Sequence, residues 1–157
     1  MNVRASAEIL GRIPIFSDCE RAHLQVLAFS ARNHSFAPGD PVIRQGTPAT
    51  RALLILDGIA ELSVAERGGL RKLGNAGPGV LLGELAMISG HHYSVTATAK
   101  SLLTAADIER DTFLRVAGEF PEFGLRVQKA LARKLEAMVS ELASVRPVFD
   151  KARAFAR

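Results

Sequence analysis

The sequence of 157 residues has one cysteine, one tyrosine and no tryptophan. A single cysteine excludes an internal disulfide and any zinc site built from several thiolates. No uncharged apolar run approaches the ~18 residues of a membrane span, and the N-terminus lacks the apolar core of a secretory signal. We therefore expect a cytoplasmic chain with no membrane partner. Hydrophobic residues make up 48% and charged residues 23% of the chain, which at this length predicts one globular domain over residues 1–157.

Most of the positive net charge of the chain lies in its last twelve residues. The net charge is +4, and residues 146–157 hold +3 of it, with four basic residues against one acidic residue. A nucleic-acid-binding face concentrates basic side chains on a folded element. We therefore predict a solvated basic tail over residues 146–157 and no nucleic-acid partner. Arginine outnumbers lysine fifteen to five, which is typical of a GC-rich bacterial genome.

Glycine is concentrated in the middle of the chain, where ten of the thirteen glycines lie between Gly39 and Gly90. Short apolar or alternating runs, separated by turn signals, predict antiparallel strands within about residues 31–109. These runs are residues 52–56, 59–64, 70–73, 94–98 and 102–108. Because the flanks have helical patterns, the predicted fold class is α+β. We expect an antiparallel β-roll, a jelly-roll-like barrel, flanked by an N-terminal helix and two C-terminal helices.

The N-terminal helix is predicted from a capping box formed by Ser17 and Glu20. The face expected to be buried comprises Cys19, Ala22, His23, Val26 and Leu27. Cys19 and His23 have the spacing of a metal-binding pair. Because no further ligands lie near them in the sequence, we interpret both as core residues and predict no metal site.

The C-terminal flank predicts a short helix over residues 110–118 and a longer helix that begins at Pro121 and ends at Pro147. Apolar residues recur along the longer helix at spacings of three and four: Phe123, Val127, Leu131, Leu135, Met138, Leu142 and Val145. We expect the first two to pack on the roll. Residues 135–145 fit either the same packed face or a short coiled-coil seam, and from the seam we predict a weak homodimer.

Three segments together resemble the cyclic nucleotide-binding domain family, which includes sensor domains of bacterial catabolite regulators, protein kinase A regulatory subunits and cyclic nucleotide-gated channels. They are residues 13–17, 36–58 and 79–101, and the similarity extends over about residues 10–145. The third segment resembles the family's phosphate-binding cassette, and we call residues 83–96 the cassette. The resemblance implies the β-roll fold and a cyclic nucleotide as ligand.

The start of the cassette is the string Gly83-Glu84-Leu85-Ala86. The resemblance implies that Glu84 accepts hydrogen bonds from a ribose 2′-hydroxyl and that the amides of Leu85 and Ala86 face the cyclic phosphate. The residue types agree, because free amides at a helix start attract anions and glycine permits close approach. Alternatively, Glu84 only stabilises the start of its own helix with its charge.

The end of the cassette departs from the family's Pro-Arg-Ser/Ala-Ala-Thr. Here Tyr93 replaces the arginine that pairs with phosphate, while Ser94 and Thr96 keep the pattern. A neutral hydroxyl in place of a guanidinium costs roughly 1.5–3 kcal/mol of charge-assisted hydrogen bonding. We therefore expect cAMP and cGMP binding to be weak or lost. The neighbouring His91 and His92 either supply the missing charge or are exposed loop residues.

The long helix offers two further candidate ligand-binding residues, Arg133 and Lys134, which lie where a lid residue reaches a ligand.

Together these features predict a regulatory module of the cyclic nucleotide-binding type, with no cofactor besides a weakly bound cyclic nucleotide or related phosphate ligand. The alternative is a protein-interaction domain without a small-molecule ligand, and in both cases we expect a protein partner. A catabolite-type transcription factor places a helix-turn-helix after the long helix, and because about a dozen residues follow Val145 we do not expect this function unless the sequence is a fragment. No set of nucleophile, base and orienting residue is evident, so we predict no catalytic residues and no enzymatic activity.

Overall fold

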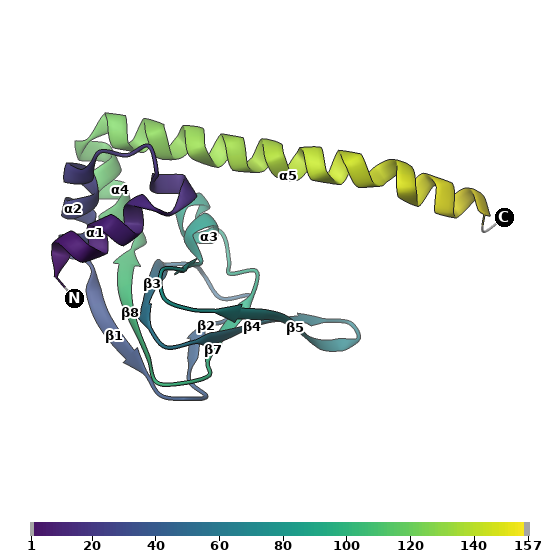
Figure 1. Cartoon of the computed structure of the whole chain (residues 1–157), viewed down its shortest axis with the longest axis horizontal. Coiled ribbons are helices and arrows are strands. Elements are labelled where there is room, and N and C mark those ends of the chain that lie inside the picture. Colours follow the sequence, from purple (N-terminus) through teal and green to yellow (C-terminus); the bar gives the residue numbers. More distant parts are fainter. Residues whose placement is uncertain (1, 156–157) are drawn as a thin grey trace.

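A computed structural model describes residues 2–155, in which two antiparallel sheets form a roll with helices on one side (Figure 1). The elements in chain order are α1 (Val3–Gly11), the 3-10 helix η1 (Pro14–Phe16), α2 (Arg21–Ser30), β1 (Arg32–Phe36), β2 (Pro41–Ile43), β3 (Arg51–Asp57), β4 (Ala60–Glu66), β5 (Gly69–Ala76), β6 (Leu81–Leu82), α3 (Glu84–Ser89), β7 (Thr96–Ala99), β8 (Leu103–Glu109), α4 (Arg110–Glu119) and α5 (Pro121–Phe155).

The roll consists of two four-stranded sheets with strand orders β1-β8-β3-β6 and β2-β7-β4-β5. This arrangement confirms the predicted α+β class and the β-roll, although the sheets stay separate and do not close into a barrel. Strand β3 has four consecutive buried residues, 52–55, because it lies inside its sheet and both faces of that sheet are covered. Helices α2, α3 and α4 pack against β3 and β8 and so bury the outer face.

Strand β4 does not follow the alternation expected for residues 59–64. Its buried residues are Ala60 and Ser63, three apart. The pairing with β5 shifts between Leu62 and Ser63, where β5 carries one extra residue, Leu73. The bulge therefore lies in β5, and β4 itself pairs with β7 without interruption.

The N-terminal capping box is not formed. Helix α2 begins at Arg21, its N-cap Glu20 makes no side-chain cap, and the hydroxyl of Ser17 donates to the carbonyl of Pro14 within η1. The predicted buried face of this helix is also wrong in part. The buried residues of α2 are Leu24, Leu27 and Ala28. Because η1 takes the residues up to Phe16, the chain turns before α2 can begin.

Cys19 lies ahead of α2, half-buried, and burial raises the pKa of its thiol to about 11. A thiol with this pKa is a poor nucleophile at neutral pH. His23 packs its ring against Phe120, with 4.5 Å between ring centroids. Among residues 2–155, no group of three metal-binding side chains occurs.

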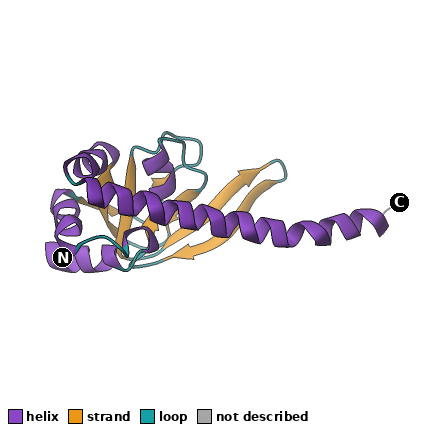
Figure 2. Cartoon of the chain, turned by 90° about the horizontal axis from the view of Figure 1, so that it is seen from above, coloured by secondary structure: helices purple, strands orange, loops and turns teal. Residues whose placement is uncertain are grey.

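The N-terminal part of helix α5 packs on the rest of the domain, and its C-terminal part extends away from it (Figures 1 and 2). Phe123 stacks with Phe16 at a centroid distance of 6.2 Å and meets Phe113 edge-on, and Val127 is also buried as predicted. From Leu135 onward the apolar side chains are exposed, because α5 runs past the edge of the roll.

The predicted end of α5 at Pro147 is wrong, since the helix continues to Phe155. Proline removes one backbone hydrogen bond and disfavours a helix interior, yet α5 runs through Pro147 without a break. The segment predicted as a basic tail is therefore helical through residue 155, with Arg146, Lys151 and Arg153 along α5. No helix within residues 2–155 is both long and apolar enough to cross a membrane.

Candidate functional site

The cassette starts where β6 ends. Gly83 adopts a left-handed conformation with φ of +76° and forms the N-cap of α3, whose first residue is Glu84. A residue with a side chain is strained in this conformation, so the turn from strand to helix requires glycine. The backbone amides of Leu85 and Ala86 lie in the first turn of α3, where helical amides have no partner within the helix.

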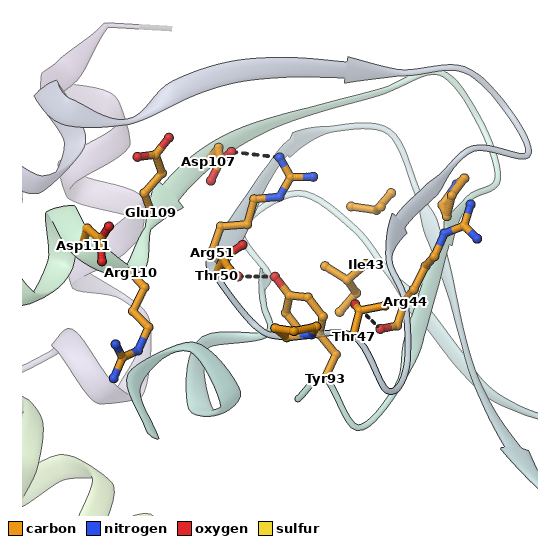
Figure 3. A pocket seen from close by; sticks show the side chains of 13 residues that line it. Ile43, Arg44, Thr47, Thr50, Arg51, Tyr93, Asp107, Glu109, Arg110 and Asp111 are labelled. Atoms are coloured by element: carbon orange, nitrogen blue, oxygen red, sulfur yellow. Dashed lines mark hydrogen bonds and ion pairs between the residues drawn. The ribbon is translucent and has the colours of Figure 1, made fainter. Parts of the chain in front are cut away.

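Tyr93 folds back over this turn. A Cβ atom at Gly83 would lie 2.6 Å from Cε1 of Tyr93, so the ring packs directly on the glycine. The phenol is buried, with 7% of the residue exposed, and its hydroxyl donates to the backbone carbonyl of Arg51 at 2.6 Å (Figure 3). Burial is the main cause that raises the pKa of Tyr93 above its ordinary value. Tyr93 therefore brings a neutral group, already bonded to β3, to the position of the family's arginine.

Glu84 is held by the C-terminal helix. Its Oε1 atom accepts a hydrogen bond from Nζ of Lys134 at 3.3 Å. The structure thus brings Lys134 to the cassette. It does not bring Arg133, which forms an ion pair with Asp18 and holds the pKa of that carboxyl below its ordinary value.

The remaining predicted residues are less closely connected to the start of α3. The hydroxyl of Thr96 accepts a hydrogen bond from the backbone amide of Gln45 at 3.0 Å, and Ser94 is exposed. His91 and His92 are also exposed. Neither imidazole has a hydrogen bond or ion pair with any residue in the described part of the chain. The backbone of the loop that carries these histidines is nevertheless fixed, because the carbonyl of His91 accepts a hydrogen bond from the backbone amide of Ala49.

Sequence reasoning missed Arg110, the first residue of α4. Its Nε atom donates to the carbonyl of Met87 at 2.8 Å, near the C-terminal end of α3. A cation is favourable there because the last carbonyls of a helix lack partners and carry partial negative charge. No signal in the sequence places residue 110 beside residue 87, since the contact depends on how β8 leads into α4.

A pocket of about 710 Å³ lies on the hydroxyl side of Tyr93 (Figure 3). It is lined by residues of β2, the following loop, the start of β3, the end of β8 and the start of α4. Its wall includes the buried carboxylate of Asp107, paired with Arg51 at 3.0 Å and close to His34 at 3.3 Å. The cassette residues 83–86 do not line it, so Tyr93 separates this pocket from the first turn of α3.

The structure thus combines a β-roll, a short helix that starts at a glycine after β6, and a long C-terminal helix. The family model of the cyclic nucleotide-binding domain matches residues 33–119, more than half of the chain. The chain therefore belongs to the cyclic nucleotide-binding domain family.

Curated relatives include regulators of several kinds. The chain is 26% identical to the CRP-like cAMP-activated global transcriptional regulator of Mycobacterium tuberculosis, with 88% of this chain and 62% of the relative covered. It is 32% identical to the cAMP-dependent protein kinase regulatory subunit of Schizosaccharomyces pombe, with 70% and 26% covered. It is 27% identical to the acetyltransferase Pat of Mycolicibacterium smegmatis, with 85% and 40% covered. The chain thus spans between about a quarter and three-fifths of these relatives.

Solved structures agree on the fold. The N-terminal domain of a transcriptional regulator from Streptomyces coelicolor superposes with a TM-score of 0.76 at 24% identity, covering 83% of this chain and 94% of that one. A cyclic nucleotide-binding-like protein from Brucella abortus superposes with a TM-score of 0.66 at 28% identity, covering 73% and 98%.

Proposed function

We propose that this regulatory domain binds a cyclic nucleotide, or a related phosphate ligand, with weak affinity at the cassette. The observation that carries the proposal is the retained first turn of α3, with Gly83 in a left-handed conformation and Glu84 beside the free amides. Two relatives are named for cAMP, which makes cAMP the first ligand to test. We propose no catalytic step and no metal or cofactor for this domain.

Weak affinity is expected from the contacts on both sides of that turn. Tyr93 offers a neutral hydroxyl that is already bonded to the carbonyl of Arg51, and the carboxylate of Glu84 is already bonded to Lys134. A phosphate there would lose a charge-assisted bond worth roughly 1.5–3 kcal/mol, or about ten- to a hundredfold in affinity.

Titration calorimetry of the wild type with cAMP and cGMP tests the proposal. We expect dissociation constants in the micromolar to millimolar range. Tyr93 is the only tyrosine and tryptophan is absent, so tyrosine fluorescence gives a second readout from within the cassette. Silence toward both cyclic nucleotides up to millimolar concentrations would favour a protein-interaction domain without a small-molecule ligand.

A protein partner is the second candidate function, and the exposed face of α5 favours it. The exposed apolar residues on this part of the helix are Leu135, Met138, Val139, Leu142, Val145, Val148 and Phe149. Five of them, at 135, 138, 142, 145 and 149, alternate in spacings of three and four, as in a coiled-coil seam. In a parallel pair of such helices, Glu141 of one copy lies opposite Arg146 of the other, which favours a second copy of this chain as the occupant.

The seam predicts weak self-association that Leu142→Glu abolishes. Leu142 is 71% exposed in the single chain, and a carboxylate at this position would be buried without a partner in the dimer. Sedimentation of both proteins up to hundreds of micromolar measures the effect. Ser140→Glu, on the opposite side of the same helix, is the matched control and should leave association unchanged. A wild type that stays monomeric over this range rules out the seam.

A further inference from the structure

The cassette helix α3 is held at both ends by cations from the C-terminal helices. Lys134 of α5 donates to Oε1 of Glu84 at 3.3 Å, at the first residue of α3. Arg110 of α4 donates to the carbonyl of Met87 at 2.8 Å, near the other end. Helices α4 and α5 are therefore both connected to the short segment that carries the proposed ligand site.

The two contacts differ in what they occupy. Arg110 uses a backbone carbonyl at the C-terminal end of α3, away from the first-turn amides. Its guanidinium lies so close to Gly90 that a Cβ there would be 3.0 Å from Nη2, so this contact is tightly packed. Lys134 instead occupies the carboxylate that the proposed ligand's hydroxyl would need.

The two partners of this ion pair differ in their exposure to solvent. Only 16% of its side chain is exposed, whereas 41% of the Lys134 side chain is exposed. The lysine is thus the more accessible partner, and its side chain can turn into solvent once its bond to Glu84 breaks. One residue earlier on the same helix, Arg133 pairs with Asp18, which keeps this turn of α5 near the N-terminal segment whether or not Lys134 is bound.

We propose that Lys134 is a self-inhibitory contact that competes with the ligand for Glu84. A ligand hydroxyl reaches the carboxylate only when Lys134 leaves it, so ligand binding releases α3 from α5 while Arg110 keeps α3 attached to α4. This inference rests on the proposed function, because it assumes that the ligand engages Glu84.

The first experiment compares Lys134→Met and Arg133→Met in the full chain, with cAMP as the probe in titration calorimetry. Exposed ion pairs are worth up to about 1 kcal/mol, so Lys134→Met should tighten cAMP binding about two- to fivefold. Arg133→Met removes an ion pair from the same helix without touching the cassette and should leave the affinity unchanged. Equal affinities for the two variants overturn the proposal. A lower affinity for Lys134→Met also overturns it, because the lysine would then act as a counter-charge for the ligand.

A second measurement does not need the ligand. Hydrogen exchange of residues 84–89 in the free protein should be at least about twofold faster in Lys134→Met than in Arg133→Met, because only the first variant loses a contact to α3. If neither variant nor the wild type binds cAMP, the proposed function fails, and exchange still decides whether Lys134 restrains α3. Equal exchange in the two variants overturns the restraint itself.

Discussion

Replacing Tyr93 with arginine is expected to tighten the binding of cAMP at least about tenfold, as measured by titration calorimetry. The phenol is neutral, since burial raises its pKa, and its hydroxyl is committed to the carbonyl of Arg51. A guanidinium at this position offers several charged donors in a planar array that matches phosphate. The gain should therefore appear for cyclic nucleotides and should weaken as salt concentration rises.

Tyr93→Phe is the matched control, because it keeps the ring against Gly83 and removes only the hydroxyl. We expect it to leave the affinity for cAMP unchanged and to lower the free energy of unfolding by about 1 kcal/mol, through loss of the bond to Arg51. An unchanged titration curve for Tyr93→Arg would contradict the expectation. It would indicate that the new side chain turns into the pocket beside Tyr93, toward the carboxylate of Asp107.

Gly83→Ala is expected to lower the free energy of unfolding by about 2–4 kcal/mol, from two separate causes. The first is backbone strain, because φ is +76° at this position. The second is a collision, because the new methyl group would lie 2.6 Å from Cε1 and 3.0 Å from Cδ1 of Tyr93. The buried ring cannot move aside without breaking its hydrogen bond to β3. Urea unfolding followed by far-ultraviolet circular dichroism measures the loss.

Two further variants separate the causes. Gly79→Ala has a similar φ of +87° with no atom within 4 Å of the added methyl group, so it should show the strain alone, about 1 kcal/mol. In a Tyr93→Ala background, Gly83→Ala should likewise cost only about that amount, since the ring is gone. Equal losses for Gly83→Ala with and without the ring would show that Tyr93 does not pack on the glycine as described.

The candidate site was predictable where its residues are contiguous. A glycine followed by a short helix start is a local pattern, and the structure has Gly83 as the N-cap and Glu84 as the first residue of α3. The replacement of arginine by Tyr93 was visible for the same reason. What Tyr93 does instead was not visible, because its hydrogen bond crosses 42 residues to Arg51. The contact of Arg110 with Met87 spans 23 residues and was missed on the same grounds.

Several errors in the fold have the same origin. The polar strand β1 was not among the predicted runs, because its residues Arg32–Phe36 carry no apolar alternation and its place depends on pairing with β8. Ser17 and Glu20 have the residue types of a capping box, but the box does not form, because η1 covers Pro14–Phe16 and α2 starts only at Arg21. Strand β4 buries Ala60 and Ser63 in place of alternate residues, next to the point where its pairing with β5 shifts.

The sequence by itself determined the α+β class, the roll between helical flanks and the start of the cassette, because hydrophobic periodicity and glycine turns act over a few residues. Only the tertiary structure decided which groups meet α3. It placed the ring of Tyr93 on Gly83, Lys134 on Glu84 and Arg110 on Met87, and it carried α5 beyond the roll and past Pro147. The physical reason is distance along the chain: a contact between residues tens of positions apart depends on how sheets and helices pack, and no local pattern encodes it.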